Sequence, residues 1–154
     1  MKFLKKSLKV TFLALSLLFL NACSSDEDSD KTVANIEGVW QLGRMYGKAK
    51  YTGMNATLEG DSEGTMEFKN DGTYDSNIIS AYLTVSIPSI NYSETTPIDP
   101  AMDSGVYFYD ETNDNLEIDG QISKVVVLNE TFMKVKTLIN DSGVTGELYT
   151  EYHR

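Results

Sequence analysis

The sequence predicts an all-β fold, a single antiparallel up-and-down barrel of about eight strands. After residue 36, no stretch keeps the apolar spacing of a helix for three turns. Short runs rich in Val, Ile, Thr, Tyr and Phe instead alternate with glycine-bearing turns, which is the pattern of strands and hairpins. Because most connections are short, the strands form a meander, and a meander closes most simply into a barrel. The barrel domain is expected over residues 36–154.

Each strand follows from local composition and from the turn after it. The triplet Asn70-Asp71-Gly72 favours a tight hairpin, because Gly72 can adopt a positive φ. Polar and apolar side chains alternate over residues 133–139 and 147–152, so one face of the sheet is expected to be buried and the other wet. The expected strands cover residues 38–46, 64–69, 73–78, 79–87 (continuing the preceding strand or starting a new one), 106–109, 115–118, 122–128, 132–139 and 144–152.

Residues 1–22 are interpreted as a secretion signal. Lys2, Lys5, Lys6 and Lys9 precede an apolar run over residues 10–20. A membrane-spanning helix takes roughly 20 apolar residues, so this run is too short to span and is typical of a signal peptide. The run ends in Leu20-Asn21-Ala22-Cys23, which resembles the lipobox of bacterial lipoproteins.

The lipobox resemblance implies a lipid anchor on Cys23. In that family a diacylglycerol is attached to the cysteine sulfur, the preceding peptide is removed, and the new amino group receives an acyl chain such as palmitate. A lone cysteine in an exported protein agrees with this, because a covalent modification would account for it. The alternative is an ordinary signal peptide with an incidental cysteine. The anchor predicts a protein held on the lipid bilayer of the outer membrane, with no other cofactor.

Residues 23–35 are expected to be an acidic tether, because they are too polar to bury anything. The segment Ser25-Asp26-Glu27-Asp28 resembles the short export signal that sends lipoproteins of the Bacteroidetes group to the cell surface. A plain spacer is the alternative. A calcium loop fits poorly, since Lys31 stands where the turn glycine is needed.

Charge and composition exclude several classes of function. The whole chain has a net charge of −10, and removing residues 1–22 takes away four bases and no acids, which leaves −14. Such a field disfavours binding to nucleic acid or to an anionic membrane face. One cysteine allows no disulfide, and the single histidine, His153, lies beside the chain end. No pair of carboxylates is singled out by its spacing, and we expect neither a metal site nor catalytic residues, so the protein is not expected to be an enzyme.

Two short motifs in the barrel domain carry a family resemblance. Gly38-Val39-Trp40, after the acidic Glu37, resembles the Gly-x-Trp strand that opens the lipocalin fold. It is similar in particular to the lipocalin-like domains of small Bacteroidetes-type lipoproteins. Those domains also carry a Phe-x-x-Asp-Gly-x-Tyr hairpin, matched here by Phe68, Asp71, Gly72 and Tyr74.

The lipocalin resemblance implies a structural role for Gly38 and Trp40. In lipocalins this tryptophan closes one end of the barrel under an arginine side chain. Arg44 and Arg154 both satisfy that requirement by a cation–π contact, and the sequence leaves the choice open. The resemblance also implies binding of a small apolar or amphipathic molecule, as a class and without named ligand residues.

All three prolines fall within residues 88–104, which are expected to form a long loop. Such loops are often lids, and this one carries four apolar side chains that would line a barrel mouth: Ile90, Tyr92, Ile98 and Met102. The alternative is a loop tucked against the barrel wall. The net negative charge favours a neutral or cationic guest. The alternative function is a filled barrel whose outer surface binds a protein or a glycan; the sequence does not determine the oligomeric state.

Overall fold

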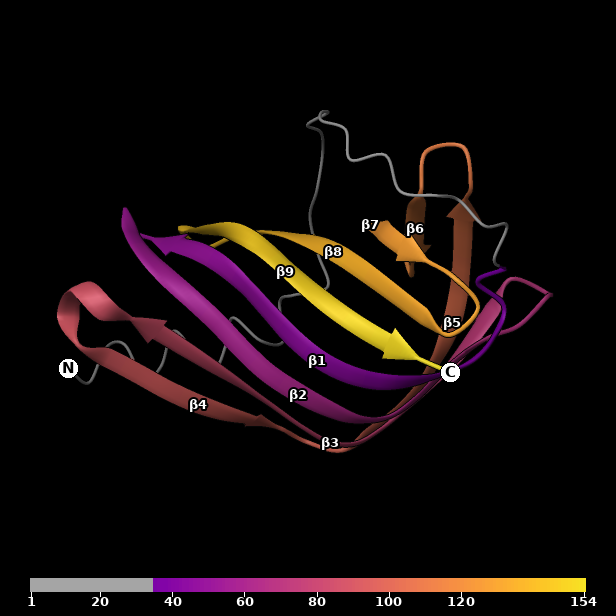
Figure 1. Cartoon of the computed structure of the whole chain (residues 1–154), viewed down its shortest axis with the longest axis horizontal. Coiled ribbons are helices and arrows are strands. Elements are labelled where there is room, and N and C mark those ends of the chain that lie inside the picture. Colours follow the sequence, from indigo (N-terminus) through magenta and orange to yellow (C-terminus); the bar gives the residue numbers. More distant parts are fainter. Residues whose placement is uncertain (1–34) are drawn as a thin grey trace.

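The structure is a computed structural model that describes residues 35–154 (Figure 1). The predicted signal peptide, Cys23 and the acidic run lie outside the described residues. The described part contains nine strands and one short 3₁₀ helix: β1 (Gly38–Tyr51), β2 (Met54–Phe68), β3 (Thr73–Ile87), η1 (Pro88–Ile90), β4 (Tyr92–Ile98), β5 (Ala101–Asp110), β6 (Asn115–Ile118), β7 (Gln121–Leu128), β8 (Phe132–Asp141) and β9 (Val144–His153).

Eight strands close into an antiparallel barrel, which confirms the predicted fold class. The ring runs from β1 through β2, β3, β5, β6, β7, β8 and β9 back to β1. The remaining strand, β4, pairs with residues 81–87 of β3, whereas β5 pairs with residues 73–78 of the same strand. The chain therefore runs back along β3 as two successive strands, β4 and then β5, and only β5 belongs to the ring.

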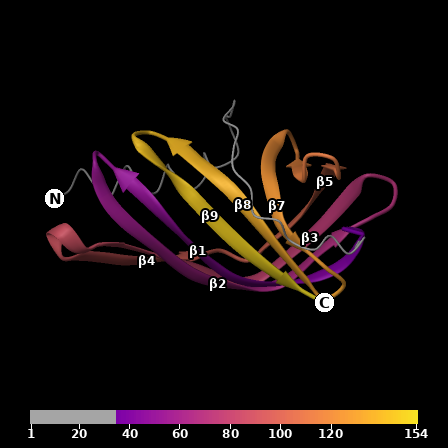
Figure 2. The ribbon, with the colours of Figure 1, turned by 45° about the horizontal axis from the view of Figure 1, so that its top comes forward.

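The strands differ in length, and this divides the domain into two halves. In the closed half all eight ring strands are present. In the extended half the sheet order is β4-β3-β2-β1-β9-β8, with β4 at one edge. The pairing of β7 with β8 ends at Lys136, so residues 137–141 of β8 form the other edge. Figures 1 and 2 show these long strands curving away from the chain's C-terminus.

Each half has its own core. Alternating side chains of the strands point inward, and the two groups of buried residues do not mix. The closed half buries Ile36, Trp40, Phe68, Tyr74, Leu116, Val125, Met133, Val135 and Tyr152. The extended half buries Ala49, Ala56, Leu58, Leu83, Ile87 and Leu148 on its concave face. We refer to these as the first and second clusters.

One part of the sequence interpretation is wrong: residues 88–104 are not a long loop. They form η1, all of β4 and the start of β5. The prolines fit because none occupies a central strand position. Pro88 begins η1, Pro97 lies on the edge strand β4, and Pro100 lies in the break between β4 and β5. Edge strands and strand ends are the positions of a sheet that tolerate a missing N–H.

Candidate functional site

Trp40, near the start of β1, is buried in the first cluster. Its side chain is 0% exposed, and its Nε1 donates a hydrogen bond of 2.7 Å to the carbonyl of Ile36. The Arg154 guanidinium lies 3.9 Å from the centre of the Trp40 ring. Arg154 Nη2 also donates to the carbonyls of Asn35 (3.1 Å), Ile36 (3.4 Å) and Glu37. The last residue of the chain therefore ties the segment before β1 to the end of the barrel.

Gly38 makes room for this arrangement. It has a φ of +113°, and a Cβ there would lie 3.3 Å from Arg154 Nη2. A side chain at this position would be strained and would press on the guanidinium. The Gly-x-Trp motif thus supplies both the tryptophan ring and the space above it that the Arg154 guanidinium occupies.

Arg44 has a different environment from Arg154. Its guanidinium lies 4.9 Å from the centre of the Tyr46 ring, on the outer face of β1. Tyr46 in turn stacks on Tyr149 of β9 with a centroid distance of 5.5 Å. Of the two arginines that the sequence offered for Trp40, the structure places Arg154 over the ring.

The second motif builds the hairpin between β2 and β3. Phe68 and Tyr74 are both buried in the first cluster. Asp71 accepts hydrogen bonds from the Thr73 amide (2.9 Å) and hydroxyl (2.6 Å), and Gly72 adopts a φ of +81°. The motif is therefore a turn that aims two aromatic rings into the core.

Tyr74 connects this hairpin to two acids. Its hydroxyl lies 2.6 Å from Asp119 Oδ2 and 3.2 Å from Asp103 Oδ2. Burial, and then the bond to Asp119, raise the pKa of Tyr74, while the same bond lowers the pKa of Asp119. Asp119 also accepts from the Val106 amide at 3.0 Å, so it links the β6–β7 turn to β5.

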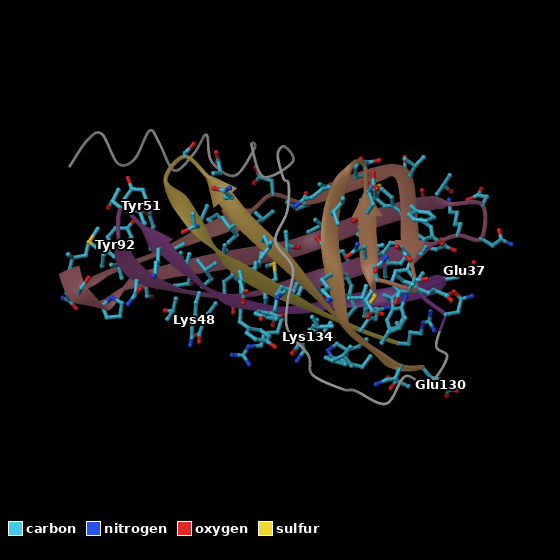
Figure 3. All side chains as sticks on the ribbon, turned by 90° about the horizontal axis from the view of Figure 1, so that it is seen from above. Glu37, Lys48, Tyr51, Tyr92, Glu130 and Lys134 are labelled. Carbon is cyan, nitrogen blue, oxygen red and sulfur yellow. The ribbon has the colours of Figure 1, made fainter. Side chains whose placement is uncertain are left out.

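The four residues predicted to line a barrel mouth are not brought together. Ile90 in η1 is 54% exposed, and Met102 on β5 is 84% exposed. Tyr92 and Ile98 do share the concave side of β4, and Tyr92 packs on the second cluster and donates to Glu94. Figure 3 shows Tyr92 beside Tyr51 at one end of the molecule, far from Glu37 and Glu130 at the other.

A cavity of about 150 Å³ lies inside the barrel among β6, β7, β8 and β9. Sequence reasoning did not predict it, although the alternation in β8 and β9 already placed four of its residues on common sides of their strands. One polar pair in its wall, Ser123 and Thr137, is joined by a hydrogen bond of 2.8 Å. Its wall consists of Leu116, Ile118, Gln121, Ser123, Val135, Thr137, Thr150 and Tyr152.

A second hollow of about 510 Å³ is an open groove on the outside of the closed end. Its wall combines the segment before β1 with the turn after β2, including Glu37, Glu67 and Asp71. The one lysine in it, Lys69, forms an ion pair of 2.6 Å with Asp75. Among residues 35–154, no three His, Cys, Asp or Glu side chains gather as a metal site would require. The same residues contain no helix long and apolar enough to cross a membrane.

Comparison with known proteins adds no neighbour: no family model, no curated protein and no solved structure matches the chain.

Proposed function

We propose that this protein is a lipid-anchored lipoprotein of the lipocalin-like type whose barrel binds a small, neutral amphipathic molecule. The cavity among β6–β9 carries the proposal. Half of its wall is apolar and half consists of uncharged hydroxyl and amide side chains. Ligand sites typically combine an apolar wall with a few polar groups that fix the orientation of the guest.

The size of the cavity indicates which part of a guest it accepts. Drug-sized ligands occupy roughly 300–1,000 Å³, so about 150 Å³ suits one end group. The wall continues into the extended half, because Thr137 pairs with Leu148 and Thr150 pairs with Met45. Leu148 belongs to the second cluster and Met45 packs against it. The apolar remainder of the guest would lie along this concave face.

The charge of the guest follows from the wall and from the whole domain. No lining side chain of the cavity carries a charge. A buried ionic group without a partner is costly, so an ionised head group would find no compensation there. The acidic domain further disfavours anionic guests. A hydroxyl or amide head group matches Gln121, Ser123, Thr137 and Thr150.

Titration with a neutral fluorescent probe, N-phenyl-1-naphthylamine, tests the ligand site. The protein carries Cys23→Ser so that no acyl chain is attached. Saturable binding is expected, and Thr137→Leu, which fills the cavity, should weaken it by about tenfold. Thr145→Leu is the matched control, because Thr145 is an exposed hydroxyl residue of β9. Absence of saturable binding to the folded protein would mean a filled barrel and would refute the ligand proposal.

Metabolic labelling with an alkyne fatty acid tests the anchor on Cys23. The wild type should be labelled and Cys23→Ser should not. Equal labelling of both proteins would refute lipidation at this residue.

Surface display is the second part of the anchor proposal, and protease added to intact cells tests it. The domain should be digested in the wild type. Replacing Asp26, Glu27 and Asp28 by alanine should protect it, because the export signal would be lost. If accessibility does not fall, the acidic run is only a spacer.

A further inference from the structure

The outer face of β5–β7 is unusually apolar for a solvent-facing wall. On β5, Met102, Val106 and Phe108 are 84%, 61% and 64% exposed. Ile122 on β7 is 50% exposed. We call these four residues the β5–β7 face; Figure 1 shows the three strands standing together as one wall.

The register places these residues on one outer wall, where Val106 and Phe108 are adjacent outward positions and polar residues separate them from Met102 and Ile122. Val106 and Phe108 are two positions apart on one strand, so they point to the same side. Phe108 pairs with Glu117 of β6, and Glu117 pairs with Ile122 of β7. One carboxylate therefore stands between two exposed apolar side chains. Single exposed apolar residues need no explanation, whereas their concentration along the outer side of one strand favours an interaction site.

The outer face of another pair of strands provides the contrast. On β3 and β4, outward positions carry hydroxyls that bond across the strands. Thr84 and Thr95 are 2.7 Å apart, and Ser86 and Ser93 are 3.0 Å apart. Exposed apolar residues occur on β3 as well, at Ile79 (55%) and Tyr82 (47%), but the three most exposed large apolar residues of the described part all lie on β5.

The surroundings of the β5–β7 face are acidic. Glu117 lies within it, and Asp75 pairs with Ser104 between Met102 and Val106. Asp110 follows Phe108 on the same side of β5. Two bases are nearby: Lys69 forms an ion pair with Asp75, and Lys124 lies two positions from Ile122 on the same side of β7, which leaves Glu117 and Asp110 as the carboxylates outside that ion pair.

We propose that the β5–β7 face docks a partner protein that presents apolar side chains ringed by lysine and arginine. Charge complementarity selects this partner. A second copy of the chain would bring two acidic rims together, and an anionic membrane would repel the same carboxylates. An apolar centre with a charged rim is the usual composition of a protein interface. This inference is independent of the ligand cavity.

A defined peptide tests the proposal by fluorescence anisotropy. The probe is a labelled peptide of alternating lysine and leucine, and the control peptide replaces lysine by glutamate. The protein carries Cys23→Ser. We expect saturable one-to-one binding of the basic peptide, weakened by salt, and no binding of the acidic one. Phe108→Ser should weaken binding by about tenfold or more, and Glu117→Gln by a smaller factor.

Leu138→Ser provides the matched control. Leu138 on β8 is an exposed apolar residue that also pairs with a carboxylate residue, Glu147 of β9. The affinity of the Leu138→Ser protein for the basic peptide should equal that of the wild type. Val106→Thr keeps a β-branched residue in the strand and guards against a folding defect in Phe108→Ser. Equal binding by Phe108→Ser, Val106→Thr and the wild type would overturn the proposal. So would a dimer in sedimentation, or co-sedimentation with phosphatidylglycerol vesicles, that Phe108→Ser abolishes.

Discussion

The closed half and the extended half of the barrel are stabilised in different ways. The closed half buries several large side chains completely, among them Trp40, which donates to Ile36, and the partly buried Tyr107 donates to Lys69 at 2.8 Å. The extended half packs alanine, leucine and isoleucine at 4–9% exposure, between two free sheet edges. It also leaves Asp141 Oδ2 buried without a hydrogen-bond partner among the described residues. The comparison indicates that the closed half anchors the fold and that the extended half is adaptable.

The edge strand β4 of the extended half carries residues that oppose pairing with other chains. Edge strands invite pairing with other chains, and inward charges and prolines oppose this. β4 carries both, since Glu94 lies on the concave side with Tyr92 bonded to it and Pro97 lies at the other end of the strand. This edge is therefore a poor template for aggregation.

The largest expected effect is at Trp40. Trp40→Ala should lower the free energy of unfolding by about 3–5 kcal/mol, because it removes a fully buried ring and empties the barrel end. Urea unfolding followed by circular dichroism measures this. The native tryptophan fluorescence should be blue-shifted; an emission maximum equal to that of the unfolded chain would place Trp40 in water and contradict the assignment.

Alkaline pH should affect the two halves unequally. Burial raises the pKa of Tyr152 in the first cluster to about 12. In the unfolded chain the pKa of a tyrosine hydroxyl is about 10, so the folded state keeps the Tyr152 proton to higher pH. The contribution of Tyr152 to the free energy of unfolding is therefore complete below pH 10 and is lost as pH rises toward 12. The loss amounts to about 2–3 kcal/mol.

Tyr152→Phe should therefore flatten the decline of stability between pH 10 and 12. In the extended half, the bond to Glu94 and then burial raise the pKa of Tyr92 to about 12 as well. Solvent screens that partly exposed pair, so Tyr92→Phe should flatten the decline less. Unfolding free energies measured across this pH range check both variants, and a larger effect from Tyr92→Phe would reverse the comparison.

Truncation in the second cluster should cost less than the loss of Trp40. Leu83→Ala is expected to destabilise by about 2–3 kcal/mol, at the low end for buried leucines, because the neighbouring strands can close on the space. Urea unfolding measures it beside Trp40→Ala. A loss equal to that of Trp40→Ala would mean that the two halves contribute equally to stability.

The smallest expected effect is at the two arginines. Arg154→Met should cost about 1–2 kcal/mol, since it removes the cation–π contact and the bonds to three carbonyls. Arg44→Met, on the outer face, should change stability by about 0.5 kcal/mol or less. A double-mutant cycle with Trp40→Phe isolates the coupling; equal losses for the two arginine variants would contradict the assignment of Arg154.

Sequence reasoning succeeded where local signals were strong. The hairpin at residues 70–72, the strands of the C-terminal half and the inward faces of β8 and β9 all follow from turn chemistry and alternation. It missed residues 54–63 of β2, which contain three acidic residues and a glycine, and it missed β4, where Pro97 and the flanking Pro88 and Pro100 suggested a loop. Both segments are strands because neighbouring strands pair with them.

The candidate site also has a part that the sequence predicted and a part that it did not. Trp40 and its arginine partner were recognisable from a motif, but the choice between Arg44 and Arg154 depends on which side of the sheet each side chain occupies. The cavity draws its wall from four strands, and its existence depends on their mutual register. No local pattern in the sequence encodes that register.

The sequence by itself determined the all-β class and the number of ring strands, because turns and alternation act over a few residues. Tertiary structure alone decided that the chain returns along β3 in two pieces, that the ring closes in one half and opens in the other, and that Met102, Val106, Phe108 and Ile122 share one exposed face. These features depend on pairings between residues distant in the chain. Such pairings are selected by the whole packed barrel and not by any one segment.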